Sequence, residues 1–320
     1  MTTRLILGVN GQDGILLSRL LDSKQIKTIG VGSQSSASQH IPSGQRYYSL
    51  DIRDTQKIID LINSLEVGIV YNLAGLSSVV ESFRDPQTTL DVNYGAVSAL
   101  LEAIYAGHSR SNVRFFQCSS SEMFGVAIDG PQNENTTLNP QSPYAEAKAK
   151  AHLKCQQFRH DGFFVSCGIL FNHESVFRPE TFVSRKVTSA VARIKLGLQE
   201  NLTIGNLDAR RDWGAAKDYV EAINGIVEND VADDFVIATG KSHSVRDLVK
   251  CALRTVGLES RFNEIVQVDQ TLLRKSDPKT TIGDSSKIKL QIGWTAKTSF
   301  EELISEMVEF DLKFKLSENR

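Results

Sequence analysis

The stretch Gly8-Val-Asn-Gly11-Gln-Asp-Gly14 follows a short apolar run, residues 4–9, and opens a segment, residues 12–24, whose apolar side chains recur with helical spacing. Glycines at a strand-to-helix turn let the backbone bend tightly and approach a pyrophosphate, which the free N–H groups of the helix N-terminus attract. A turn of purely structural use is the simpler explanation for glycines alone. Because this turn joins a strand pattern to a helix pattern, we expect it to bind a dinucleotide.

Strand and helix patterns alternate through the first half of the chain. We expect strands at residues 4–9, 27–31, 46–50, 68–74, 113–118 and 163–170, and helices at residues 12–24, 54–65, 87–107 and 142–161. This alternation predicts an α/β fold with a Rossmann-type doubly wound parallel sheet. The regular alternation ends near residue 172. We therefore expect a dinucleotide-binding domain over residues 1–171 and a smaller mixed α/β domain over residues 172–320, with the chain crossing back to the first domain.

Composition narrows the classes of function. The 320 residues include 36 Lys and Arg against 38 Asp and Glu, and 41% are hydrophobic, so neither bulk binding of nucleic acid nor disorder is expected. No apolar run is long enough to span a membrane, and polar residues interrupt the first run, so we expect no membrane segment and no signal peptide. The four cysteines and six histidines are scattered, which favours reduced thiols, a cytoplasmic location and no metal site.

Two further motifs carry residues suited to proton transfer. Tyr144 and Lys148 are four residues apart, so they share one face of a helix, where a lysine ammonium favours the phenolate. Together with the charge of a nicotinamide, we expect Lys148 to bring the phenol pKa from about 10 towards about 7. Ser119-Ser-Ser-Glu122 ends a predicted strand, where open α/β sheets place their ligands and a carboxylate can move a proton. If each motif is considered alone, Tyr144 and Lys148 could simply lie on a solvated helix face, and Ser119-Ser-Ser-Glu122 could simply be a polar turn.

The three motifs stand in the order and at the separations typical of extended short-chain dehydrogenase/reductases, and the chain resembles the GDP-mannose 4,6-dehydratase family within them. The most specific matches lie outside the shared motifs, and they are Gly11-Gln-Asp-Gly14, Ile169-Leu-Phe-Asn-His-Glu-Ser175, Glu180-Thr-Phe-Val-Ser-Arg-Lys186, Gly205-Asn-Leu-Asp-Ala-Arg-Arg-Asp-Trp-Gly214, Ala216-Lys-Asp-Tyr-Val-Glu-Ala222, and Phe235-Val-Ile-Ala-Thr-Gly240 with His243-Ser-Val-Arg246. The related reductases lack the Asn-His-Glu-Ser segment, which favours a dehydratase.

This resemblance implies a hydro-lyase that converts GDP-mannose to GDP-4-keto-6-deoxy-mannose with a recycled nicotinamide cofactor. It implies a triad of Ser120, Tyr144 and Lys148, in which Tyr144 takes the proton of the hydroxyl on the sugar's fourth carbon. It also implies that Glu122 removes the hydrogen on the fifth carbon while water leaves from the sixth. A transient ketone stabilises the carbanion-like transition state of such an elimination.

The resemblance also implies which residues contact the two ligands. Those expected around the dinucleotide are Gly8, Asn10, Gly11, Gln12, Asp13, Gly14, Ser33, Asp51, Ile52, Leu73, Ala74, Gly75, Ser77, Tyr144, Lys148, His173 and Arg178. Those expected around the nucleotide sugar are Ser77, Glu122, Asn172, Lys186, Arg211, Arg274 and Asp277. Asp51 suits a hydrogen bond to the adenine amino group, and arginines and lysines suit a diphosphate. Residues 172–320 are thus expected mainly to bind the nucleotide sugar.

The sequence departs from the family at the end of the second strand, where residues determine the choice between NADP and NAD and contribute to the oligomer. The family's second strand ends in Arg-Arg-Ser-Ser, whose arginines meet the 2′-phosphate of NADP and help to build a tetramer, whereas this chain has Ser33-Gln-Ser-Ser36. An acid that would select NAD at this strand end is missing as well. With Ser33, Gln34 and Arg178 as the remaining donors, we expect NADP, and NAD stays the alternative. We also expect a homo-oligomer, either a dimer or a tetramer.

Changes near the expected sugar site leave the exact sugar open. The segments Gly75-Leu-Ser-Ser78, Val176-Phe-Arg-Pro179 and Arg274-Lys-Ser-Asp277 stand in place of the family's Ala-Gln-Ser-His, Pro-Arg-Arg-Gly and Arg-Pro-Thr-Glu. Another GDP-sugar, such as a GDP-heptose, would fit the same chemistry. An epimerase or reductase of the same superfamily is a second hypothesis. A dinucleotide-binding regulator or scaffold without catalytic activity is a third.

Overall fold

A seven-stranded parallel sheet forms the centre of the fold in the computed structural model, which describes residues 2–107, 113–126, 130–272 and 280–318. Its strands are β1 (Thr3–Leu7), β2 (Thr28–Gly32), β3 (Arg46–Ser49), β4 (Val67–Asn72), β5 (Arg114–Ser120), β6 (Val165–Leu170) and β11 (Asp234–Ile237). Their order is β11-β6-β5-β4-β1-β2-β3. The strand order therefore reverses at β1, which pairs with both β2 and β4, and the predicted doubly wound sheet is confirmed.

Helices cover both faces of this sheet. They are α1 (Gln12–Ser23), α2 (Thr55–Ser64), α3 (Val79–Arg84), α4 (Pro86–Leu90), α5 (Ala96–Ala106), α6 (Pro143–His160), α8 (Ala216–Glu228) and α11 (Ser286–Ile292). Side chains alternate along β1, so Leu5 and Leu7 enter a core with α2, α5 and α6, whereas Ile6 enters the opposite core with α1 and α8. Strands buried on both faces read as continuous apolar runs, which explains the signal in the sequence.

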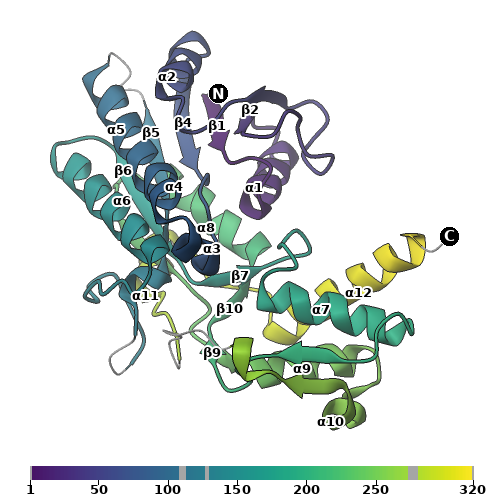
Figure 1. Ribbon diagram of the computed structural model, residues 1–320. Coiled ribbons are helices and arrows are strands. Elements are labelled where there is room, and N and C mark those ends of the chain that lie inside the picture. Colours follow the sequence, from purple (N-terminus) through teal and green to yellow (C-terminus); the bar gives the residue numbers. More distant parts are fainter. Residues whose placement is uncertain (1, 108–112, 127–129, 273–279, 319–320) are drawn as a thin grey trace.

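A second group of elements lies below and to the right of the large sheet in Figure 1. Its helices are α7 (Val183–Lys195), α9 (Val245–Thr255), α10 (Phe262–Ile265) and α12 (Phe300–Glu318). Its paired strands are β8 (Leu202–Ile204) with β13 (Val266–Val268), β9 (Arg210–Arg211) with β12 (His243–Ser244), and β7 (Asn172–Glu174) with β10 (Trp213–Ala215). Apolar side chains of α7, α9 and α12 form a core of their own. The chain returns from this group to the sheet, because β11 pairs with β6.

The helix expected over residues 87–107 is interrupted. The structure has α4, then a π-helical turn at Asp91–Gly95, then α5. The turn places the buried Asn93 against the loop after β4, where its amide donates to the Leu76 carbonyl and accepts from the Leu76 N–H, each at 2.9 Å. A single π-helical turn within a helix is often found at functional sites. The spacing of apolar residues in the sequence does not reveal it.

In the part of the chain that the structure describes, each helix is too short or too polar to cross a bilayer.

Candidate active site

The three glycines of the first turn have different structural roles. Gly8 has a φ of +82°, and a Cβ there would lie 2.7 Å from the Ala74 backbone. A Cβ on Gly14 would lie 2.4 Å from the Gly8 carbonyl oxygen. Gly11 precedes α1, and no side chain caps the N–H groups of that helix start. Gly8 and Gly14 therefore allow close packing, whereas Gly11 leaves the helix N-terminus bare, as an anionic pyrophosphate requires.

Alanine at two of these positions should separate packing from binding. We expect Gly14→Ala to lower the free energy of unfolding by about 3 kcal/mol, because its methyl group meets backbone that cannot yield. Gly11→Ala meets one backbone oxygen at 3.3 Å, so we expect little loss of stability but about tenfold weaker dinucleotide binding. Chemical denaturation and isothermal titration with NADP measure the two effects. Equal losses of stability in both variants would contradict this assignment.

Three cavities open at the carboxyl ends of the parallel strands, each about 300 to 350 Å³ in volume. The glycine-turn cavity is lined, among the predicted residues, by Gly8, Asn10, Gly11, Ser33, Asp51, Ile52, Leu73, Ala74 and Gly75. The central cavity is lined by Asp13, Leu73, Gly75, Ser77, Ser120, Glu122, Tyr144, Lys148, Asn172, His173 and Arg178. The outer cavity is lined by Glu122, Asn172, Lys186 and Arg211.

The cavities form one continuous trough. Leu73 and Gly75 line both the glycine-turn and the central cavity, and Glu122 and Asn172 line both the central and the outer cavity. The trough brings together nearly all the residues that the sequence singled out. Gln12 and Gly14 line none of the three cavities. Arg274 and Asp277 lie outside the described residues.

The first turns of α6 place Tyr144 and Lys148 against the end of β5. Ser142 caps the helix by accepting a hydrogen bond from the Ala145 N–H at 3.1 Å. Tyr144 is only 8% exposed and Lys148 only 5%, so this face of the helix is not solvated. Lys148 Nζ donates to the Cys118 carbonyl at 2.9 Å, and the Ser120 hydroxyl hydrogen-bonds the Tyr144 phenol.

The protein's own groups act on the pKa of the Tyr144 phenol in opposite directions. Burial raises its pKa above the ordinary value, and the lowering by Lys148 and by the Ser120 hydrogen bond does not compensate fully. The protein's own groups therefore leave the pKa raised, and Lys148 alone does not produce a phenolate. A further positive charge beside the ring, such as that of a bound nicotinamide, is needed to reach the pKa of about 7 that we expected.

Glu122 lies in a short 3₁₀ turn (Ser121–Phe124) that follows β5. Ser120 caps this turn by accepting from the Glu122 N–H at 3.2 Å. The turn ends at Gly125, whose φ is +65° and where a Cβ would lie 1.9 Å from the Asn139 carbonyl oxygen. This sharp exit directs Glu122 to the boundary between the central and outer cavities.

The Gly-Gln-Asp-Gly and Asn-His-Glu-Ser segments bind each other. Gln12 donates to the His173 carbonyl at 3.1 Å and accepts from the Ser175 hydroxyl at 2.8 Å. Asp13 Oδ2 lies 3.0 Å from His173 Nε2, and His173 Nδ1 lies 2.7 Å from the Phe171 carbonyl oxygen. Gln12 is thus committed to protein partners, while Asp13 and His173 also face the central cavity. The sequence showed both segments but not their contact.

The Asp13–His173 pair predicts a pH-dependent contribution to stability. Burial would raise the pKa of Asp13, but His173 and Arg178 outweigh it and hold that pKa below its ordinary value. Burial would lower the pKa of His173, but Asp13 raises it above the ordinary value. The contribution of the pair is therefore lost as the pH falls through the lowered pKa of Asp13 and as it rises through the raised pKa of His173.

We expect Asp13→Asn to lower the free energy of unfolding by about 3 kcal/mol near pH 6, because it leaves a buried partner without its counter-charge. This loss of unfolding free energy should become smaller above the raised pKa of His173, because the imidazole is then neutral in the wild type and has no ion pair to lose. Urea denaturation across a pH series measures this, with the exposed Asp22→Asn on the same helix as the control. A deficit that does not change with pH would contradict the ion pair.

The glycine-turn cavity contains a charged pair that the sequence analysis did not find. Arg53 binds both carboxylate oxygens of Asp51, at 2.9 and 2.8 Å, and this contact lowers the pKa of Asp51 to about 2. Ser33 and Gln34 line the same cavity, and Asn10 donates to the Gln34 side chain at 3.0 Å. Arg178, in contrast, lines the central cavity beside Glu174 and does not join Ser33 and Gln34.

The outer cavity contains two cations, Lys186 and Arg211, together with the acids Glu122 and Glu174. Arg211 is buried and donates to its neighbour's backbone carbonyl, and Lys186 lines the same wall from α7. Two cations at one cavity suit a diphosphate. Trp213 and Leu272 add apolar surface to the lining.

The doubly wound sheet, with the glycine turn and the trough at the carboxyl ends of its strands, defines a Rossmann-type class of enzyme. Solved structures that share this fold include UDP-glucose 4-epimerase from Thermotoga maritima, with a TM-score of 0.87 and 24% identity over 98% of this chain and 100% of that one. They also include dTDP-glucose 4,6-dehydratase from Bacillus anthracis, with a TM-score of 0.84 and 18% identity over 99% of this chain and 98% of that one.

Sequence comparison gives the family. Residues 5–307 match the family described as GDP-mannose 4,6 dehydratase. The GDP-mannose 4,6-dehydratase of Yersinia enterocolitica is 37% identical, over 98% of this chain and 94% of that protein, and the human one is 36% identical, over 97% and 91%. The chain belongs to the GDP-mannose 4,6-dehydratase family, and the resemblance seen in the sequence is confirmed.

Proposed function

We propose that the protein is a GDP-mannose 4,6-dehydratase that forms GDP-4-keto-6-deoxy-mannose. The observation that carries this proposal is the convergence of Ser120, Glu122, Tyr144 and Lys148 on the central cavity. On one side this cavity continues into a glycine-lined cavity at the start of α1, where no side chain caps the helix. On the other side it continues into a cavity where Lys186 and Arg211 could bind a nucleoside diphosphate. Family membership supports the same reaction.

The chain's own residues divide the proton transfers between them. Tyr144 takes the proton of the hydroxyl on the sugar's fourth carbon, and Ser120 orients both the phenol and that oxygen. Glu122 then takes the proton of the fifth carbon, which the new ketone has acidified, and returns a proton to the sixth-carbon hydroxyl as it leaves as water. A bound nicotinamide would supply the oxidation of the fourth carbon and the return of the same hydride to the sixth, and the proton that Tyr144 took would then return to the fifth carbon.

Two binding regions follow from the trough. We infer that the large sheet holds the dinucleotide, with its pyrophosphate at Gly11 and its adenine beside Asp51 and Ile52. Residues 172–320 mainly hold the GDP-sugar, with Lys186 and Arg211 at its diphosphate and Asn172 beside the sugar. This division remains a proposal that ligand-bound structures would test.

The proposed cofactor is NADP in preference to NAD. The end of β2 offers Ser33 and Gln34, and the carboxylate of Asp51 in the same cavity is already bound by Arg53. Among the described residues that line this cavity, there is no free acid that would select NAD through the ribose hydroxyls. Mass spectrometry of the dinucleotide that copurifies decides the point. NADP is expected, and NAD would overturn this preference while leaving the dehydratase proposal intact.

Incubation with GDP-mannose and catalytic NADP tests the reaction. We expect a product lighter by one water that carries a ketone, with no net change in the nicotinamide absorbance. A product of unchanged mass would indicate an epimerase, and stoichiometric consumption of NADPH would indicate a reductase. Conversion of another GDP-sugar, such as a GDP-heptose, in preference to GDP-mannose would retain the chemistry and change the substrate.

We further propose a homo-oligomer, dimer or tetramer, working in the cytoplasm. The four cysteines are free thiols, which suits a reducing compartment. Light scattering of the purified protein tests the assembly.

A further inference from the structure

Helix α6 carries a third polar side chain on the face of Tyr144 and Lys148. His152 follows Lys148 by four residues, as Lys148 follows Tyr144, so the three side chains form one row on the helix. Each member reaches the end of β5. Tyr144 is bonded by Ser120, Lys148 donates to the Cys118 carbonyl, and His152 Nδ1 lies 3.0 Å from Ser119 Oγ. Three successive strand residues are thus tied to three successive turns of the helix.

The His152–Ser119 bond is closed off from water. His152 is 3% exposed and Ser119 is 2% exposed, although Ser119 also contributes to the lining of the central cavity. Ser119 precedes Ser120 in the chain, so a hydrogen bond that fixes the Ser119 hydroxyl also restrains the backbone next to Ser120 of the proposed triad. A buried hydrogen bond of this kind has no water to replace it when one partner is removed.

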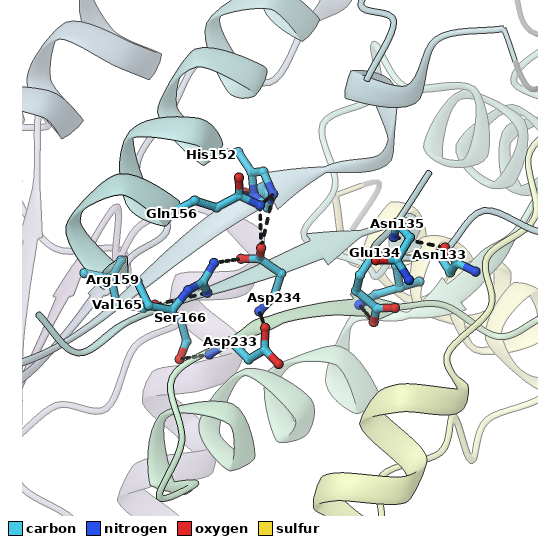
Figure 2. Close-up of polar contacts among 12 residues, drawn as sticks. Asn133, Glu134, Asn135, His152, Gln156, Arg159, Val165, Ser166, Asp233 and Asp234 are labelled. Carbon is cyan, nitrogen blue, oxygen red and sulfur yellow. Dashed lines mark hydrogen bonds and ion pairs between the residues drawn. The ribbon is translucent and has the colours of Figure 1, made fainter. Parts of the chain in front are cut away.

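The other side of the imidazole is fixed by a charged network, which Figure 2 shows. His152 Nε2 lies 3.2 Å from Gln156 Nε2 and 3.6 Å from Asp234 Oδ2. Asp234 accepts from Gln156 at 2.7 Å and from Arg159 at 2.7 Å. Asp234 begins β11, the strand by which the chain returns to the sheet. The network therefore joins α6, β5 and β11 around His152.

This cluster is a hydrogen-bond network and not a metal site. One ligand atom each of His152, Cys167 and Asp234 lie within 4.8 Å of one another, the one such group among the described residues. Both oxygens of Asp234 are already bound, one of them by the cation of Arg159. Burial raises the pKa of the Cys167 thiol well above its ordinary value, which disfavours the thiolate that a metal needs.

We propose that His152 is a positioning residue, which holds Ser119 and thereby sets Ser120 against the phenol of Tyr144. This inference rests on the proposed function, because it gives Tyr144 and Ser120 their proposed roles. The groups that face Tyr144 are Lys148, Cys118 and Glu122, and the variants described next leave all three in place. Ser120's hydrogen bond lowers the phenol pKa, so a displaced Ser120 should raise it.

The test compares His152→Phe, which keeps a ring and removes the bond, with Ser119→Ala, which removes the bond from the other side. We expect each to lower kcat about tenfold, with the KM for GDP-mannose changed less than about twofold. The acidic limb of the pH profile, which reports the loss of the Tyr144 base on protonation, should move to higher pH in both. The double variant should be no worse than either single variant, because both remove the same bond.

Two further variants keep the test sharp. His152→Asn places an amide at the same number of bonds from Cα as Nδ1, so we expect it to restore most of kcat and the wild-type pH profile. His160→Phe, at the exposed last residue of α6, is the matched control and should change neither. A lower thermal midpoint in His152→Phe with kcat and pH profile unchanged would show a structural role only and overturn the proposal.

A second readout separates this inference from the proposed function. Ultraviolet difference titration against Tyr144→Phe reports the ionisation of Tyr144 alone and needs no substrate. If the wild type does not convert GDP-mannose, the proposed function fails, and the titration still decides the positioning role. A raised Tyr144 pKa in both His152→Phe and Ser119→Ala supports it, and an unchanged pKa overturns it.

Discussion

Tyr144→Phe is expected to lower turnover of GDP-mannose about 10³-fold, because it removes the one hydroxyl that can take the proton of the fourth-carbon alcohol. The phenyl ring still fills the buried position at the start of α6, so the fold should persist. Neither product nor a transient change in nicotinamide absorbance should appear on addition of substrate. Product mass and stopped-flow absorbance measure the two steps.

Tyr105→Phe provides the control for this prediction. Its hydroxyl bonds the Asp161 carbonyl at 3.3 Å, and Tyr105 lines none of the three cavities. We expect it to retain full turnover and a similar thermal midpoint. If Tyr144→Phe also turned over at the wild-type rate, another group would have to accept the proton.

The part of the fold that alternates apolar runs with helical spacing could be predicted from the sequence. The strands of the large sheet other than the exposed edge strand β3 are mostly buried on both faces, so their apolar runs are continuous and their boundaries fall within a few residues of those expected. The glycine turn and the Tyr144 motif could be placed for the same reason, since each follows a strand or opens a helix. Patterns of neighbouring residues are sufficient to predict the elements whose structure depends on neighbouring residues.

Contacts between distant segments could not be predicted in this way. The bonds from Gln12 to His173 and Ser175 join residues about 160 positions apart, and the bonds from Asn93 to Leu76 depend on a π-helical turn. The raised pKa of Tyr144 has the same origin, because burial is a property of the assembled fold. The sequence shows His152 only as one of six scattered histidines, and its bond to Ser119 depends on the packing of α6 against β5.

Glu122→Gln should block the reaction at a different step from Tyr144→Phe. The amide keeps the size of the side chain and its place in the turn after β5, but it cannot take the fifth-carbon proton. Tyr144, Ser120 and Lys148 are unchanged, so oxidation at the fourth carbon should proceed. We therefore expect overall turnover to fall about 10³-fold, while the absorbance of reduced nicotinamide appears on mixing and persists.

The persistence of that absorbance is what makes the assignment specific. Glu146→Gln, an exposed acid between Tyr144 and Lys148 on α6, is the matched control and should leave turnover unchanged. Full turnover in Glu122→Gln would place the base elsewhere. Loss of the absorbance change together with turnover would make Glu122 a residue for substrate placement, because then even the first proton transfer would need it. If the absorbance of reduced nicotinamide persists and no water is lost from the substrate, Glu122 is the group that the elimination requires.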